Sequence, residues 1–261
     1  MCILFIAVQQ HPDYPLIIAA NRDEFHQRPT LASTFWAPEN QLLAGKDVSA
    51  NGSWMGITHT GKIAALTNIR APGRDRSDAV TRGELVIDYL QQDYSSDNYL
   101  AKISANKDAY NGFNLLYGEL DNLHVYNNYE DHHESLNKGV YGLSNAMLNT
   151  PWPKIDKGKQ ALADYCSAPT PLNVEHLFEL LKNDRPAEDE ILPKTGVPLE
   201  RERLLSSIFI KSVDYGTRSS TVLLIDNNKD VYWQERTFAP DGIETNRCDF
   251  QFAIKRNIYK R

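Results

Sequence analysis

Cysteine is scarce in this chain of 261 residues: Cys2, Cys166 and Cys248 lie far apart and are the only three. An odd number of widely spaced cysteines argues against a disulfide framework and against a zinc knuckle. A reducing compartment fits this usage, so we expect a cytoplasmic protein. A chain of this length can bury a large core without disulfides or metals. We therefore expect a single domain over residues 1–261 and no bound metal.

Long hydrophobic runs and basic runs are also missing. The apolar residues 1–8 follow no basic segment and are too few for a signal peptide or a bilayer span. The net charge is −6, and no run of Lys and Arg exceeds two residues. Nucleic acids and anionic membranes both need a basic face. We therefore expect a small-molecule ligand, no nucleic acid and no membrane insertion.

Short apolar runs predict strands, and apolar positions at helical spacing predict helices. The expected strands are residues 2–8, 16–20, 54–58, 62–67, 112–118, 123–127, 139–145, 221–225 and 230–236. The expected helices are residues 82–93, 97–106, 157–166, 174–182 and 201–208. Asn173 is a good N-cap for the fourth helix.

Strands and helices occur in separate blocks, and the strands are nearly all apolar rather than alternating. Both faces of the sheets are therefore expected to be covered. This pattern favours an α+β fold, a four-layer αββα sandwich of two antiparallel sheets with helices outside. A single sheet with helices on both faces is the rival arrangement.

Cys2 has the most unusual position among residues that could carry chemistry. If Met1 is removed, Cys2 carries both a thiol and the α-amine of the chain. The ordinary pKa is about 8 for an α-amine and about 8.5 for a cysteine thiol. One residue can then supply the nucleophile and its general base. A small buried hydrophobe on an edge strand is the alternative, because most free cysteines have that role.

Polar side chains at the ends of apolar strands form a second group of candidates. In Asn21-Arg22-Asp23-Glu24, the Arg22 guanidinium can hold a thiolate or a carboxylate, and Asp23 can orient an α-ammonium. Asn68 and Asn145 each end an apolar strand, where an amide can donate to an oxyanion. Each of these segments also fits an ordinary solvated turn.

Two further segments contain residue types that often lie in sites. Arg218 precedes an expected strand and is either a second cation in a site or an exposed arginine. Asp131-His132-His133-Glu134 has metal-ligating side chains but no second cluster at ligand spacing, so we interpret it as a solvated loop. Neither a phosphate-binding glycine loop nor a dinucleotide fingerprint is present.

Ten different short sequence blocks, spread in order along the whole chain, carry a resemblance to a known family. They are Met1-Cys2, Ala20-Asn21-Arg22-Asp23-Glu24, Ala44-Gly45-Lys46-Asp47, Asn51-Gly52-Ser53-Trp54-Met55-Gly56, Ala65-Leu66-Thr67-Asn68-Ile69-Arg70, Arg82-Gly83-Glu84-Leu85, Tyr110-Asn111-Gly112-Phe113-Asn114, Gly142-Leu143-Ser144-Asn145-Ala146, Thr150-Pro151-Trp152-Pro153-Lys154 and Tyr215-Gly216-Thr217-Arg218-Ser219-Ser220-Thr221. These blocks resemble the NRDE family, the homologues of transport and Golgi organisation protein 2. Asn51 stands where that family usually has glycine, a change expected to alter only a turn.

The resemblance implies an N-terminal-nucleophile hydrolase fold, distantly similar to the choloylglycine hydrolase and penicillin V acylase group. In that group a terminal cysteine is the nucleophile, an arginine and an acid follow on the next strand, and two asparagines end strands. A second arginine lies late in the chain. The matching residues are Cys2, Arg22, Asp23 or Glu24, Asn68, Asn145 and Arg218. The spacing of arginine and acid differs from the acylases, so either acid fits.

Three functions follow from the resemblance. The first is a Cys2-dependent amidohydrolase that acts on a small amide and requires no cofactor. The second is a haem-binding or haem-trafficking protein, because the family is associated with haem handling. Haem would then be the ligand, held by an apolar surface and one axial His, Cys, Met or Tyr. The third is an interaction protein linked to secretion or Golgi organisation, which rests on family association alone.

Overall fold

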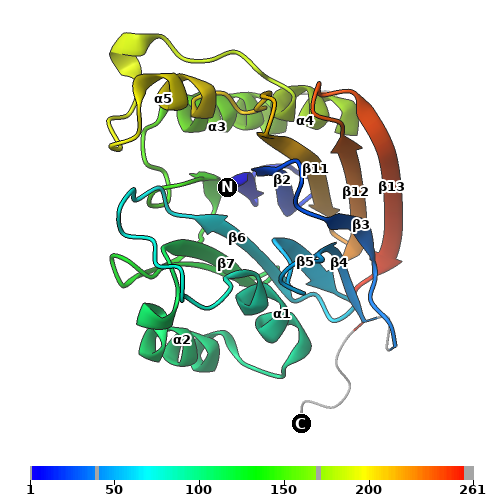
Figure 1. Cartoon of the computed structure of the whole chain (residues 1–261). Coiled ribbons are helices and arrows are strands. Elements are labelled where there is room, and N and C mark those ends of the chain that lie inside the picture. Colours follow the sequence, from blue (N-terminus) through cyan, green and yellow to red (C-terminus); the bar gives the residue numbers. More distant parts are fainter. Residues whose placement is uncertain (1, 39–40, 169–171, 256–261) are drawn as a thin grey trace.

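Two antiparallel sheets lie face to face between two layers of helices (Figure 1). This computed structural model describes residues 2–38, 41–168 and 172–255. The arrangement confirms the expected four-layer αββα sandwich, and the rival single sheet is wrong. No helix in these described ranges combines the length and the hydrophobicity needed to cross a bilayer.

The first sheet contains both ends of the described chain. Its strand order is β10 (Gly139–Leu143), β1 (Cys2–Val8), β2 (Leu16–Phe25), β11 (Tyr215–Ile225), β12 (Asp230–Phe238) and β13 (Glu244–Ala253). Helix α3 (Pro153–Ser167) packs on β1 and β10, and α4 (Val174–Leu181) packs on β2 and β11. Asn173 caps α4 as expected, because its side chain accepts a hydrogen bond from the Glu175 N–H at 3.0 Å.

The second sheet follows chain order from β3 to β9. Its strands are β3 (Thr30–Phe35), β4 (Leu42–Asp47), β5 (Met55–Thr58), β6 (Ile63–Asn68), β7 (Phe113–Glu119), β8 (Asn122–Asn127) and β9 (His132–Ser135). Helix α1 (Gly83–Gln91) covers β4 to β7, and the Tyr99 ring of α2 (Ser96–Ala105) packs against Tyr89 of α1. Helix α5 (Leu199–Leu205) and two short 3₁₀ helices, η1 (Lys107–Ala109) and η2 (Asp189–Ile191), complete the fold.

The central strands are apolar throughout because both of their faces are buried. Along β1, Leu4, Ile6 and Val8 enter the layer between the sheets, whereas Ile3, Phe5 and Ala7 face the helical layer. Successive side chains of a strand point to opposite faces, so an apolar residue is needed at every position. This two-sided burial explains why the strands lack an alternating pattern.

Every expected strand and helix overlaps one in the structure, but four strands were not expected: β3, β4, β9 and β13. Strands β3, β9 and β13 are edge strands, and β13 alternates between half-buried and exposed residues. Such strands bury too little apolar surface to show as an apolar run. The expected solvated loop at residues 131–134 is therefore wrong in part, because His132, His133 and Glu134 belong to β9.

Gly158 allows α3 to pack closely on β1. An added Cβ atom there would lie 2.0 Å from Cζ of the fully buried Phe5. We expect Gly158→Ala to lower the free energy of unfolding by about 1–3 kcal/mol, because overpacking forces side chains or backbone to move. Urea denaturation measures the change, with Lys157→Ala at the neighbouring exposed position as the control. An unchanged midpoint would contradict this account of the α3–β1 contact.

Candidate active site

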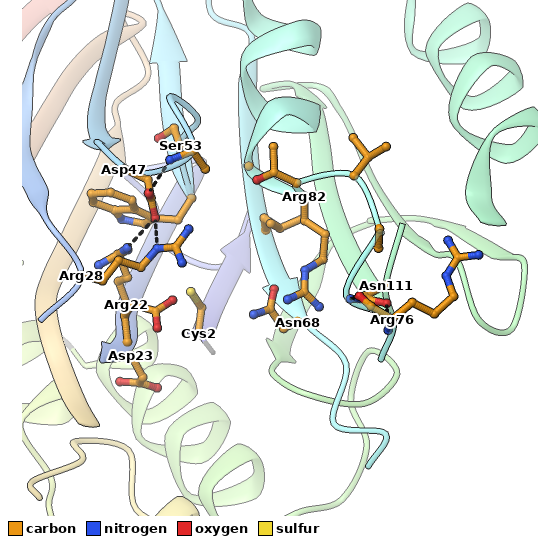
Figure 2. A pocket seen from close by; sticks show the side chains of 18 of the residues that line it. Cys2, Arg22, Asp23, Arg28, Asp47, Ser53, Asn68, Arg76, Arg82 and Asn111 are labelled. Carbon is orange, nitrogen blue, oxygen red and sulfur yellow. Dashed lines mark hydrogen bonds and ion pairs between the residues drawn. The ribbon is translucent and has the colours of Figure 1, made fainter. Parts of the chain in front are cut away.

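A pocket of about 300 Å³ lies where the two sheets approach each other beside the start of β1. The first sheet contributes Cys2, Arg22 and Asp23, and the second contributes Asp47 and Asn68. Figure 2 shows Cys2 between two groups, with Arg22, Arg28 and Asp47 on one side and Asn68 with Arg82 on the other. Residues far apart in the sequence therefore surround one thiol.

Strand pairing explains how Cys2 meets the Asn21–Glu24 motif. Cys2 lies directly opposite Arg22 in the β1–β2 pair, and opposed side chains of antiparallel strands share a face. The motif does not follow the strand, as the sequence had suggested, but lies within the longer β2. Ser144 lies on the neighbouring side, where its Oγ is 3.2 Å from the carbonyl oxygen of Cys2 and 3.0 Å from Oδ1 of Asn145, and its single hydrogen is shared between these two acceptors.

Arg22 is held in place by an ion pair at one edge of its guanidinium and by an aromatic ring over one face. Its Nη2 lies 3.1 Å from Oδ2 of Asp47, and its guanidinium carbon lies 4.4 Å from the Trp54 ring centroid. Gly45 leaves room for that ring, since an added Cβ atom would lie 2.2 Å from it. Within the described residues, Nη1 of Arg22 is buried without a hydrogen-bond partner. Arg22 therefore retains a buried donor that a bound ligand can use.

Asp47 is the carboxylate shared by two arginines. Its Oδ2 accepts from Nε of Arg28 at 2.6 Å as well as from Arg22. Burial alone would raise the pKa of Asp47, but the hydrogen bond from Arg28 and the charges of Arg28 and Arg22 outweigh burial and lower it. Asp47 is therefore ionised at neutral pH and neutralises part of the positive charge beside Cys2.

Asp47 also fixes the turn in which the chain departs from the family pattern. Oδ1 of Asp47 accepts from the Ala50 N–H at 3.1 Å, and the Asp47 N–H donates to the Gly52 carbonyl at 2.9 Å. Asn51 lies in this turn with φ of 54°. This is the left-handed region that glycine adopts freely and that asparagine tolerates better than most residues. The turn therefore forms with asparagine in place of glycine.

Cys2 and Asp23 are both affected by burial. Burial raises the pKa of the Cys2 thiol, so the thiol is neutral at rest. Burial also raises the pKa of Asp23 to about 6, although the charges of Lys154 and Arg22 and a hydrogen bond from Thr217 oppose the shift. That bond runs from Oγ1 of Thr217 to Oδ1 of Asp23 at 2.7 Å. A neutral thiol can act as a nucleophile only if a base takes its proton.

Asn68 and Asn145 have different positions relative to the pocket. Asn68 lines it at the end of β6, whereas Asn145 is buried and is not among the described lining residues. Nδ2 of Asn145 donates to the Asn68 carbonyl at 2.9 Å, and the Asn145 carbonyl accepts from the Arg70 N–H at 2.7 Å. Asn68 can therefore meet a ligand, and Asn145 holds the backbone that carries Asn68.

Arg218 is also absent from the described lining of the pocket. The register between β11 and β2 shifts between Thr217 and Ser219, so Arg218 is the additional residue of a bulge. Its Nη1 donates to the carbonyls of Phe25 and Arg28 at 2.9 and 3.1 Å. Arg218 thus lies near the site but holds the segment that carries Arg28, instead of supplying a second cation to the pocket.

Arg82, which the sequence did not indicate as a site residue, is one of four arginines that line the pocket. It immediately precedes α1, and its guanidinium lies beside Asn68 in Figure 2. Nη1 of Arg82 donates to the Gly112 carbonyl at 3.0 Å, and burial lowers the pKa of the guanidinium. The block Arg82-Gly83-Glu84-Leu85 contained this residue, but a charged residue at a helix start is usually a surface feature.

Lys154 was missed because the predicted helix began at residue 157. Helix α3 begins at Pro153, a residue type favoured in the first turn, and this places Lys154 on the buried face with Ile155 and Gly158. Burial and the charge of Arg70 lower the pKa of Lys154 to about 7, although Asp23 and Cys2 act in the opposite direction. The site therefore has a buried amine behind the pocket.

The described pocket does not fit an enclosed haem. Cys2 is the one lining side chain of the His, Cys, Met or Tyr type that binds haem iron axially. The apolar lining side chains, mainly Trp54, Leu66 and Val80, are too few to cover a macrocycle, and four arginines and three acids line the rest. Haem binding elsewhere on the protein stays a prediction that a haem titration can test.

Comparisons with known proteins agree with this fold. The fold resembles that of N-terminal-nucleophile hydrolases. The Caenorhabditis elegans N-acylethanolamine-hydrolyzing acid amidase (NAAA) ortholog matches with a TM-score of 0.50 and 12% identity, over 85% of this chain and 92% of that chain. A variant of the conjugated bile acid hydrolase from Clostridium perfringens matches with a TM-score of 0.50 and 8% identity, over 98% of this chain and 99% of that chain.

The family comparison is more specific. The model of the Transport and Golgi organisation 2 family matches residues 1–240. The Transport and Golgi organization protein 2 homolog of Bos taurus is 38% identical over 274 residues, which cover 96% of this chain and 99% of that protein. The chain belongs to the Transport and Golgi organisation 2 family.

Proposed function

We propose that this protein is an amidohydrolase that uses Cys2, freed by removal of Met1, to cleave a small amide. The observation that carries the proposal is the pocket in which Cys2 lies beside Arg22, Asp23 and Asn68. The two solved structures of similar fold add support, since one is named as an amidase and the other as a hydrolase. Their low sequence identity limits that support to the fold.

The first half of the reaction transfers the acyl group to Cys2. The Cys2 thiol is neutral because of burial, so the α-amine takes its proton as Sγ forms a bond to the carbonyl carbon. Nδ2 of Asn68 donates to the resulting oxyanion, and one such donor contributes roughly 3 kcal/mol to a transition state. The α-ammonium then returns the proton to the nitrogen of the leaving amine as the C–N bond breaks, which leaves a thioester.

The second half hydrolyses the thioester. A water molecule attacks the thioester carbonyl while the α-amine takes one of its protons, and the C–S bond breaks as that proton returns to Sγ. The products are a carboxylic acid, the free amine and the original thiol. Asp23 lies on β2, opposite Thr217 of β11, and orients the α-ammonium between these steps. Arg22 uses Nη1, which has no hydrogen-bond partner among the residues that the structure describes, to hold a polar group of the substrate.

The test compares two forms of the same chain. Intact mass first establishes that Met1 has been removed, and the protein is then incubated with a panel of small N-acyl amides while amine release is followed. We expect release from the form with a free Cys2 amine and not from a form extended by residues ahead of Cys2. A processed protein that releases no amine from any panel member would contradict the proposal. Equal turnover by the extended form would exclude the α-amine as the base.

A further inference from the structure

Lys154 brings an ammonium group into the interior, where Cys2 and Asp23 act on its charge. It lies in the first turn of α3, and only 3% of the residue is exposed to solvent. Nζ of Lys154 lies 3.5 Å from Oδ1 of Asn145, and the Trp152 ring centroid lies 5.9 Å away. A lysine is rarely buried to this extent without a charged partner.

The ionisable groups whose charges act on Lys154 come from several elements. Those that act on its charge are Cys2 of β1, Asp23 of β2, Arg70 after β6 and Glu202 of α5. Glu202 is already occupied: Oε2 accepts from Nη1 of Arg70 at 2.7 Å, and Oε1 accepts from both N–H and Oγ1 of Thr195. Of the two acids, Asp23 acts more strongly than Glu202 on the charge of Lys154.

Lys154 also fixes the orientation of the Asn145 amide. Oδ1 of Asn145 accepts from Ser144 Oγ at 3.0 Å and faces Nζ of Lys154, so Nδ2 points to the Asn68 carbonyl. The Ser144 hydroxyl and the Lys154 ammonium both lie on the oxygen side of the Asn145 amide. A flipped amide would place its NH₂ group against the ammonium, so that two donors would face each other. Asn68, which lines the pocket, depends on this orientation for its backbone position.

We propose that Lys154 is a positioning residue of the Cys2 site, whose ammonium balances Asp23, orients the Asn145 amide and makes ionisation of the Cys2 thiol easier. Its effect on turnover rests on the proposed hydrolysis, but its effect on the thiol does not. The pKa of Lys154 is about 7 and that of Asp23 about 6, so the charge balance beside Cys2 changes around neutral pH. Two groups whose charges act on each other titrate as a coupled pair.

The test measures how fast iodoacetamide alkylates Cys2, from about pH 5 to pH 10, in the full chain. Mass spectrometry of the peptide that contains Cys2 gives the rate without any need for turnover. Loss of a nearby positive charge raises a thiol pKa by about one unit or more. Iodoacetamide should therefore alkylate Cys2 of the Lys154→Met variant about tenfold more slowly at neutral pH than Cys2 of the wild type. Lys157→Met on the exposed face of the same helix is the matched control and should follow the wild-type profile.

Lys154→Arg separates charge from packing. Arginine stays charged at every pH of the experiment, so this variant should ionise Cys2 at a lower pH than the wild type does. The apparent pKa of the Cys2 thiol should be lowest in Lys154→Arg, intermediate in the wild type and highest in Lys154→Met. A purely structural role predicts shifts in the same direction for both variants, and either that result or no shift would overturn the inference. If Lys154→Met does not fold by circular dichroism, the direction of the Arg shift alone decides.

Discussion

Cys2→Ala is expected to abolish amide hydrolysis, with a loss of at least about 10³-fold in kcat, because loss of a nucleophile removes the whole covalent route. Cys2 is half-buried and packs at the margin of the layer between the sheets, so the fold should persist. Amine release and the iodoacetamide adduct on the Cys2 peptide are the two measurements. Circular dichroism of the variant verifies that any loss of activity is chemical.

Cys248→Ala is the matched control for this experiment. Cys248 lies on the edge strand β13, where its thiol faces the Glu235 carbonyl at 3.8 Å, and burial raises the pKa of the thiol to about 12. We expect this variant to hydrolyse amides as the wild type does. If Cys2→Ala retained wild-type turnover, the nucleophile would have to be another group and the proposed reaction would be wrong.

Several residues of the site could be predicted from the sequence because they depend on local chemistry and on recognisable strands. Cys2 drew attention through its position beside Met1, and Arg22 through its place in a charged motif next to an apolar strand. A short turn between two apolar runs indicates an antiparallel pair, and that pairing brings Arg22 opposite Cys2. Asn68 similarly ends a recognisable strand and lines the pocket.

The remaining residues depend on features that no local pattern contains. A single bulge on β11 sends Arg218 to the carbonyls of Phe25 and Arg28, and a bulge leaves no signal in one sequence. Arg82 enters the pocket only because α1 packs against the second sheet beside Asn68. The fold was easier to predict than the site. Apolar runs indicate which segments are buried, but they do not indicate which polar side chains lie together in the folded protein.

The sequence contained a signal for Lys154 that the helix prediction did not use. Helix α3 buries Lys154, Ile155, Gly158 and Leu162 on one side, and a proline at the first position marks where a helix starts. Extending the apolar stripe back to that proline would have placed a lysine on the buried face. A buried lysine beside a buried aspartate is the kind of pair that perturbs titration at functional sites.

Asp47→Ala is expected to have the largest effect on stability, a loss of about 3–5 kcal/mol in the free energy of unfolding, because it leaves a buried arginine uncompensated. The side chain of Arg22 is only 4% exposed, and its Nη2 depends on Asp47 for its ion pair. Arg28 loses the same partner, and the Ala50 N–H loses its hydrogen bond. The two like charges of Arg22 and Arg28 then face each other without an intervening carboxylate.

Urea denaturation of wild type and variant at several pH values measures this loss. The folded-state pKa of Asp47 lies below its ordinary value of 3.8, so the stability that its carboxylate provides is present above that pH and is lost as the pH falls through the folded-state pKa. The difference between the two proteins should therefore be full at neutral pH and shrink in acid. Asp184→Ala, which removes the exposed partner of Lys211, is the control and should cost less than about 1 kcal/mol. An equally small effect of Asp47→Ala would contradict this prediction, because it would mean that water reaches Arg22 and compensates its charge. The pocket beside Cys2 would then be more hydrated and less ordered than its contacts indicate.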